Sequence, residues 1–213
     1  ISKQGEPYNN PSYDLNTVNG AIEALLNPNL SMRYLGWVSL KDIGNDAVPA
    51  LEKVFNENNN PRFKARALWM LSKIGNNNEA YIENALKSDN PDIRITAFRA
   101  ARQSGMDLTP IIQQLVSDKD PQVRRDVAIA LRNYKSDQAA EFWATLALQH
   151  DGEDRWYLEA LGIGASNNWD QYYSTWLKKA EKEIINSTCK KIGFTEKTEA
   201  FGDCYLSIRK EVK

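Results

Sequence analysis

The sequence predicts an all-α protein whose helices form a right-handed solenoid of about five helical pairs, followed by a small C-terminal appendage. Prolines recur roughly every thirty residues, at Pro28, Pro61, Pro91 and Pro121, and an apolar pattern of helical period follows each one. No segment shows the alternating pattern of a strand. A repeat of this length cannot bury its apolar face alone, so neighbouring copies are expected to stack.

Each repeat is predicted to begin with a helix whose N-cap stands directly before the proline. A short polar side chain there accepts a free N–H of the first turn, and a proline at the next position has no N–H that would stay unbonded. A degenerate fifth copy starts at Gly152. The predicted N-caps are Asn27, Asn60, Asn90, Asp120 and Asp151.

An apolar stripe on these helices is predicted to form the core. It occupies positions two, six and ten residues after the proline, which lie about one turn apart. In one copy these are Val123, Val127 and Leu131. The corresponding residues of the other copies are Leu30, Tyr34, Val38, Phe63, Ala67, Leu71, Ile93, Ala97, Ala101 and Leu158.

A second amphipathic helix completes each repeat, in the stretches DAVPALEKVFNEN, NEAYIENALKS, LTPIIQQLVS and QAAEFWATLALQH. We expect an extended N-terminal segment over 1–14, the repeat solenoid over 15–180 and a two-cysteine tail over 181–213. The chain begins with Ile1 and not with methionine, from which we expect a processed form or a piece of a longer protein.

Composition restricts the classes of function. The formal net charge of −1 predicts neither a nucleic-acid nor a membrane partner, and no apolar run is long enough to cross a bilayer. Two cysteines and one histidine offer little material for a metal site, and the sequence contains no CxxC, CxxCH or HExxH. It also has no glycine-rich phosphate loop and no nucleophile elbow. We therefore expect no catalytic, cofactor-binding or metal-binding residues.

The repeat unit resembles the short HEAT-like repeat, of the type also found in phycobilisome lyases, with the pattern D-x-P-x-V-R-x-x-A-x-x-A-L. Arg124, Ala128 and Leu131 match it in one copy, and Arg94 and Ala97 match part of it in another. The resemblance implies a HEAT/armadillo-type solenoid, and a non-catalytic scaffold that binds another protein or a domain of a larger assembly.

A narrower resemblance covers residues 13–179, above all in WATLALQHDGEDRWYLEALGIGA. These residues look like the HEAT region of large secreted bacterial membrane-bound dehydrogenases, in which a quinoprotein-like propeller precedes that region and a c-type cytochrome follows it. No propeller sequence and no CxxCH occurs here. The resemblance therefore implies a periplasmic or secreted scaffold beside a dehydrogenase or electron-transfer assembly. A fragment of a multidomain oxidoreductase and a cytoplasmic protein are the alternatives.

One basic position recurs three residues after each repeat start, in Lys64, Arg94, Arg124 and Arg155. A place kept in every repeat indicates an architectural role, and we expect these side chains to bond loop acids of the adjacent repeat, namely Asp89, Asp118 and Asp120. A buried pair of this kind costs about 3–5 kcal/mol to break from one side.

A second set of side chains is predicted on the concave face, which the proline-started helices line in HEAT-type stacks. Arginine and tryptophan are enriched at the centres of protein interfaces, so we expect this face to bind a protein. A solvated face balanced by acids and a strip that follows a phosphate backbone are the alternatives, with nucleic acid the less favoured partner. The predicted residues are Met32, Arg33, Arg66, Trp69, Arg99, Arg102, Arg125 and Arg132.

The remaining candidates lie toward the C-terminus. Aromatics such as Trp143 and Trp169 are expected to pack the core and cap the last repeat, with a sugar-stacking platform as the alternative. His150 is expected at a helix C-terminus, where the dipole favours it. A cation site or a general base is the other interpretation of His150. Cys189 and Cys204 would form a disulfide in a secreted protein and stay as two free thiols in a cytosolic one. The sequence around them resembles a short C-terminal motif of many bacterial proteins, which could form a small hairpin or a tether.

Overall fold

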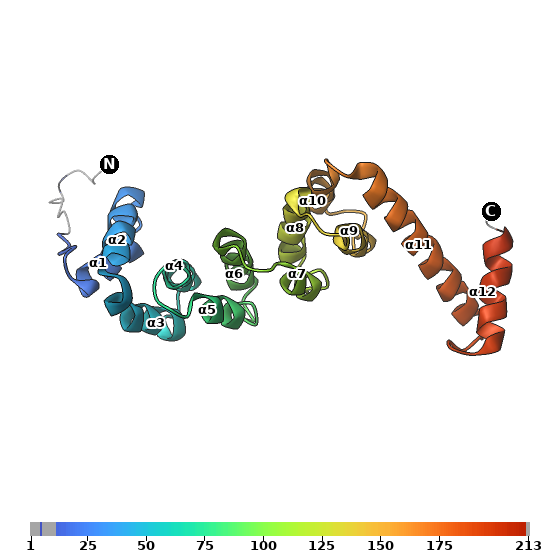
Figure 1. The fold of residues 1–213 in the computed structure, drawn as a ribbon, viewed down its shortest axis with the longest axis horizontal. Helices are drawn as coiled ribbons and strands as arrows, with labels where there is room; N and C mark the ends of the chain where they lie inside the picture. The colour runs from blue at the N-terminus through green and yellow to red at the C-terminus, as the bar shows by residue number, and fades with distance from the viewer. Residues whose placement is uncertain (1–4, 6–11, 212–213) are drawn as a thin grey trace. The chain divides into compact units, whose positions relative to one another are not determined.

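The computed structural model describes Gly5 and residues 12–211. These residues form helices and no strand, which confirms the predicted all-α class. The chain divides into two compact units, Ile1–Leu108 (unit 1) and Thr109–Lys213 (unit 2), and each is considered by itself (Figure 1). Most of the extended segment predicted over 1–14 lies outside the described residues.

Unit 1 is built of helices that pack in consecutive pairs. In chain order they are α1 (Val18–Leu26), α2 (Leu30–Ile43), the 3-10 turn η1 (Gly44–Ala47), α3 (Val48–Glu57), α4 (Pro61–Leu71), α5 (Asn78–Ala85) and α6 (Pro91–Ser104). α1 packs against α2, α3 against α4, and α5 against α6. α4 also packs against α6, so the proline-started helices stack on one another as a repeat solenoid requires.

Unit 2 repeats the arrangement and then departs from it. Its elements are α7 (Thr109–Leu115), α8 (Pro121–Ala130), the 3-10 turn η2 (Leu131–Asn133), α9 (Ala139–Leu148), α10 (Arg155–Ala165), α11 (Trp169–Lys191) and α12 (Glu199–Glu211). α8 packs against α10, and α9 packs against α11. First helices therefore stack on first helices and second helices on second, which buries a continuous apolar layer between successive repeats.

The three middle repeats begin where the sequence predicts. The side chains of Asn60, Asn90 and Asp120 accept the N–H groups of Arg62, Asp92 and Gln122 at 3.0, 2.8 and 2.8 Å. The predicted stripe is buried in these repeats, with Phe63 half-buried. The fully buried members are Ala67, Leu71, Ala97, Ala101, Val123, Val127 and Leu131.

In the first repeat the prediction is wrong by two residues. Asn27 is not the N-cap: Asn29 is, and it accepts the N–H of Met32 at 3.2 Å. Asn27 instead follows the last residue of α1, so only three residues separate α1 from α2 and a helix begun at Pro28 would leave no room for the turn. The stripe moves with the cap, because Gly36 and Leu40 are buried while Leu30 and Tyr34 are 72% and 63% exposed. Val38 is half-buried.

The fifth repeat is displaced by three residues. Asp151 is not the N-cap: its carboxylate accepts the N–H groups of Glu153 and Asp154 within a turn, and Gly152 has a φ of +87°, which is outside the helical range. Asp154 caps α10 by accepting the N–H of Tyr157 at 3.0 Å. The buried stripe is consequently Tyr157, Leu161 and Ala165, whereas the predicted Leu158 is 58% exposed.

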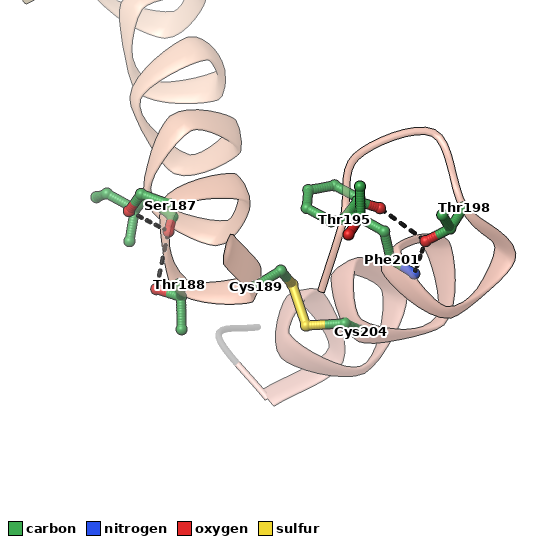
Figure 2. The surroundings of a disulfide bond; sticks show 8 residues. Ser187, Thr188, Cys189, Thr195, Thr198, Phe201 and Cys204 are labelled. Atoms are coloured by element: carbon green, nitrogen blue, oxygen red, sulfur yellow. Dashed lines mark hydrogen bonds between the residues drawn. A yellow bond between two sulfur atoms is a disulfide. The ribbon is translucent and has the colours of Figure 1, made fainter. Parts of the chain in front are cut away.

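The two-cysteine tail is a helical hairpin. α11 continues through residue 181, where the repeats were predicted to end, as far as Lys191. Cys189 on α11 and Cys204 on α12 form a disulfide with an S–S distance of 2.12 Å (Figure 2). Ile185 is buried beside the disulfide. The hydroxyl of Thr198 accepts the N–H of Phe201 at 3.2 Å, which satisfies an N–H at the start of α12 (Figure 2).

Candidate functional site

Three of the four predicted braces bind main-chain carbonyl oxygens. Arg94 is 5% exposed and donates from Nη1 to the carbonyl oxygens of Ser88 and Asp89 at 2.7 and 3.0 Å. Arg124 donates to the carbonyl of Asp118 at 2.6 Å, and Lys64 donates to the carbonyl of Asn56 at 3.1 Å. The acceptors of these hydrogen bonds are main-chain oxygens: those of Arg94 and Arg124 lie in the loop before their helix, and that of Lys64 lies in the last turn of α3.

Arg155 occupies a different place from the other three. Because the N-cap of α10 is Asp154, Arg155 is the first residue of its helix and not the fourth. Its side chain is 82% exposed and lies 3.6 Å from Glu159 of the same helix. The structure therefore places Arg155 on the surface of one repeat and not between two.

Two residues predicted for partner binding connect successive repeats. Arg66 on α4 donates from Nη1 to the carbonyl oxygens of Leu25 and Asn27 at 3.2 and 3.3 Å, at the end of α1. Arg125 on α8 lies 3.9 Å from the carboxylate of Asp154, the N-cap of α10. Both side chains are half-buried. Arg66 thus contacts the preceding part of unit 1, and Arg125 contacts the following repeat of unit 2.

The other members of the predicted strip are dispersed. Arg99 and Arg102 are exposed on α6, and Arg102 lies 5.8 Å from the centroid of the Phe98 ring. Arg132 is exposed in unit 2, and Met32 is half-buried on α2. Only Arg33, Arg66 and Trp69 of the eight meet in one described pocket.

This pocket lies in unit 1, and we call it the basic aromatic pocket. It has a volume of ≈ 390 Å³. Its walls come from α1, α2, α4 and α6, with Lys73 two residues beyond the end of α4. Besides Arg33, Arg66 and Lys73 it is lined by Leu25, Leu30, Tyr34, Trp37, Trp69 and Gln103.

Positive charge dominates the basic aromatic pocket, since three cations and no carboxylate line it. The pKa of Arg66 is lowered, first by burial and then by the positive charges of Arg33 and Arg62. The buried Nε of Arg33 has no hydrogen-bond acceptor within the described part of the chain. Lys73 lies 6.0 Å from the centroid of the Trp69 ring. An anion placed here would relieve the mutual repulsion of these cations.

Leu30 and Tyr34 were predicted for the core and not for a surface pocket, because the N-cap of their helix was misplaced. With Asn27 taken as the N-cap, Leu30 and Tyr34 fall on the buried stripe. With Asn29 as the N-cap they fall outside it. The second asparagine of the Asn27–Pro28–Asn29 run was the signal that could have placed them on the surface, because asparagine is a favoured N-cap.

Unit 2 contains a second pocket, made almost wholly of aromatic and aliphatic side chains, which we call the aromatic cleft. It has a volume of ≈ 430 Å³ and lies between α9, α10 and α11. Trp169 and Tyr173 stack with their ring centroids 5.8 Å apart, and Trp143 meets Trp169 edge to face at 6.1 Å. Trp143 is 4% exposed and donates to the carbonyl of Leu161 at 2.9 Å, so it is part of the core.

His150 at the edge of the aromatic cleft closes a turn. Its Nδ1 accepts the N–H of Gly152 at 3.1 Å, and its Nε2 lies 2.9 Å from the carbonyl oxygen of Asp154. With Nδ1 as an acceptor, Nε2 carries the proton and donates it. Within residues 12–211, no three or more His, Cys, Asp or Glu side chains gather in a way that would hold a metal ion.

Comparison with known families supports a HEAT-like repeat. Residues 78–162, from α5 into α10, match the model of HEAT repeats. Such repeats generally act as non-catalytic scaffolds for protein interaction. No curated protein matches the chain. Across the described residues, no helix has both the length and the apolar character that a bilayer crossing requires.

Proposed function

We propose that this protein is a non-catalytic HEAT-repeat scaffold that binds another protein through the basic aromatic pocket and its rim. The observation on which the proposal rests is the exposure of Leu30 and Tyr34. These residues stand one turn apart on α2 and leave a large apolar area in water beside three cations. Exposed apolar surface that borders a pocket is typical of interaction sites.

The composition of the pocket supports a protein partner. Tryptophan, tyrosine and arginine are the residues that most often dominate binding energy at interfaces, where they fill or line well-packed pockets. Trp37, Trp69, Tyr34, Arg33 and Arg66 together supply this set in unit 1.

We further propose an extracytoplasmic setting, beside a dehydrogenase or electron-transfer assembly. The Cys189–Cys204 disulfide supports such a setting, because disulfides form and persist mainly in oxidising compartments. The resemblance of residues 13–179 to the HEAT region of membrane-bound dehydrogenases supports the assembly. Rapid alkylation of free thiols in the native source tests the compartment: a native protein in which both cysteines react contradicts it.

Affinity capture from the native source tests the binding function. The bait variant is Leu30→Ser with Tyr34→Ser, which removes apolar area from two exposed positions and leaves the core intact. Ile184→Ser is the matched control, because Ile184 is 65% exposed on α11 of the other unit. We expect the wild type and the control to capture the same partners in equal amounts, and the double variant to lose them. Equal recovery on all three baits would place the interface elsewhere.

A further inference from the structure

We propose that the basic aromatic pocket recognises an acidic segment of the partner protein, in which a carboxylate stands next to an aromatic or large aliphatic side chain. This inference rests on the proposed protein-binding function and adds the chemistry of the bound segment.

The positive charge of the basic aromatic pocket is not neutralised by ion pairs within the described part of the chain. Arg33, Arg66 and Lys73 line it, and within the described part of the chain none of the three forms an ion pair with an acidic side chain. The whole chain, by contrast, has a formal net charge of −1, so acids elsewhere balance its basic residues. Charge complementarity therefore favours the binding of a negatively charged group of another molecule in this pocket.

The guanidinium groups of Arg66 and Arg33 differ in how far hydrogen bonds within the protein fix them. Nη1 of Arg66 is fixed by the carbonyl oxygens of Leu25 and Asn27, which orients the group before any ligand arrives. Arg33 is half-buried, and its Nε is closed to solvent and has no hydrogen-bond acceptor within the described part of the chain. A carboxylate would therefore meet the two Nη groups of Arg33, which a planar guanidinium presents side by side.

The aromatic and aliphatic walls of the pocket favour an apolar side chain next to the carboxylate of the bound segment. Tyr34 and Leu30 are exposed at its rim, and Trp37 and Trp69 line its interior. Lys41 and Lys73 lie 5.5 and 6.0 Å from the centroids of the Trp37 and Trp69 rings, so both rings carry a cation near them. A volume of ≈ 390 Å³ lies within the roughly 300–1,000 Å³ of small-ligand pockets, which suits one large side chain and a carboxylate.

The same geometry disfavours a nucleic acid. A phosphate backbone is bound by cations spaced along its length, each of which neutralises one phosphate. Here the three cations converge on one pocket whose rim is apolar, and Arg125 of the expected strip is already paired with Asp154.

Fluorescence anisotropy with the full chain tests the inference. The probe is a short labelled peptide with one phenylalanine between glutamates. Two matched peptides replace either the glutamates by glutamine or the phenylalanine by serine. We expect the acidic peptide to bind. The glutamine peptide should bind at least about tenfold more weakly because it loses charge-assisted hydrogen bonds, and the serine peptide should also bind at least about tenfold more weakly because it no longer buries the phenylalanine ring. Equal affinity for the acidic and glutamine peptides would overturn the inference.

Variants of the protein assign the binding to this pocket. Arg33→Gln and Lys73→Gln should each weaken the acidic peptide about tenfold, while Arg132→Gln, an exposed arginine in unit 2, should leave its affinity unchanged. Thermal unfolding of each variant separates a lost contact from a lost fold. Unchanged affinity in both folded pocket variants contradicts the inference, as does an oligonucleotide of equal charge that competes more strongly than the peptide.

The two proposals can fail separately. If the acidic peptide does not bind while Leu30→Ser with Tyr34→Ser still abolishes capture of a partner, the acidic chemistry is wrong and the binding function stands. If capture is also unaffected by the double variant, both proposals are wrong.

Discussion

Arg124 joins two repeats of unit 2 through Tyr157: its Nε donates to the Tyr157 hydroxyl over 3.2 Å, and its guanidinium carbon lies 5.4 Å from the centroid of the ring. The hydroxyl in turn donates to the carbonyl of Leu146 at 3.0 Å. Burial raises the pKa of Tyr157, so the hydroxyl remains a neutral donor at neutral pH. One arginine of α8 is thus linked to α10 directly and to α9 through the tyrosine.

Arg124→Ala is expected to lower the free energy of unfolding by about 2–3 kcal/mol, because it removes charge-assisted hydrogen bonds to Asp118 and Tyr157. Arg155→Ala is the control, since its side chain is exposed, and should change stability by no more than about 0.5 kcal/mol. Chemical denaturation measures both. A loss in Arg155→Ala as large as that in Arg124→Ala would contradict the role assigned to Arg124.

The role of Arg124 shows what the sequence can predict of a repeat contact. The recurrence of a basic residue predicted a brace at Arg94 and Arg124, and their side chains do lie against loops. The sequence pointed to loop carboxylates as acceptors, and the structure adds carbonyl oxygens of these loops at Arg94 and Arg124. Every residue has such an oxygen, and only the fold decides which ones face an arginine.

The hydrogen bond between Tyr81 and Glu52 is expected to make the free energy of unfolding depend on pH above about pH 10. Its hydroxyl donates to a carboxylate oxygen of Glu52 at 2.6 Å. That hydrogen bond, followed by burial and the negative charge of Glu52, raises the pKa of Tyr81 to about 12. In the unfolded chain this tyrosine ionises with its ordinary pKa of 10.0, so the stabilisation is full below that pH and is lost as the pH rises through about 12.

We therefore expect Tyr81→Phe to lose less stability than the wild type between pH 10.0 and about 12. Denaturant unfolding at several pH values measures this difference, and ultraviolet titration should show one fewer tyrosine ionising near pH 12. A wild type and a variant with parallel stability curves over this range would contradict the Glu52 contact.

Reduction of the Cys189–Cys204 disulfide is expected to loosen the hairpin and spare the repeats. The bond spans a sequence separation of 15, and closing a loop of this size stabilises the folded state by roughly 3 kcal/mol. Apart from the disulfide, α12 is held mainly by Phe201, Tyr205 and Ile208 packed beside Ile185. Hydrogen exchange should therefore accelerate in α12 on reduction and stay unchanged in α8 and α10.

The matched control for reduction is the double variant Cys189→Ser with Cys204→Ser. It should exchange rapidly in α12 with or without reductant. Faster exchange in α8 and α10 of the reduced wild type would mean that the hairpin supports the repeats, contrary to this prediction.

The candidate pocket was harder to predict than the fold because it depends on register. Stacking of repeats follows from a period that persists although the caps of the first and fifth repeats are displaced by two and three residues. A pocket depends on which side chains share a surface, and a shift of two residues moved Leu30 and Tyr34 from the core to the rim. Arg33, Arg66 and Trp69, three of the eight residues predicted for one face, line the pocket together, but the convergence of α1, α2, α4 and α6 around them depends on tertiary packing.

Alanine substitutions at two glycines of α10 distinguish the effect of close helix packing on stability from the effect of helix propensity. A Cβ on Gly164 would lie 2.2 Å from the carbonyl oxygen of Ala128, so Gly164→Ala must push α10 away from α8 and is expected to destabilise unit 2 by about 1–3 kcal/mol or more. A Cβ on Gly162 meets nothing within 4 Å, and alanine inside a helix is favoured over glycine by about 0.5–1 kcal/mol. Gly162→Ala should therefore raise the unfolding midpoint that Gly164→Ala lowers, in the same helix and with the same added methyl group. Denaturant unfolding of both variants measures this, and a shift in the same direction for both would contradict the close approach of α8 and α10.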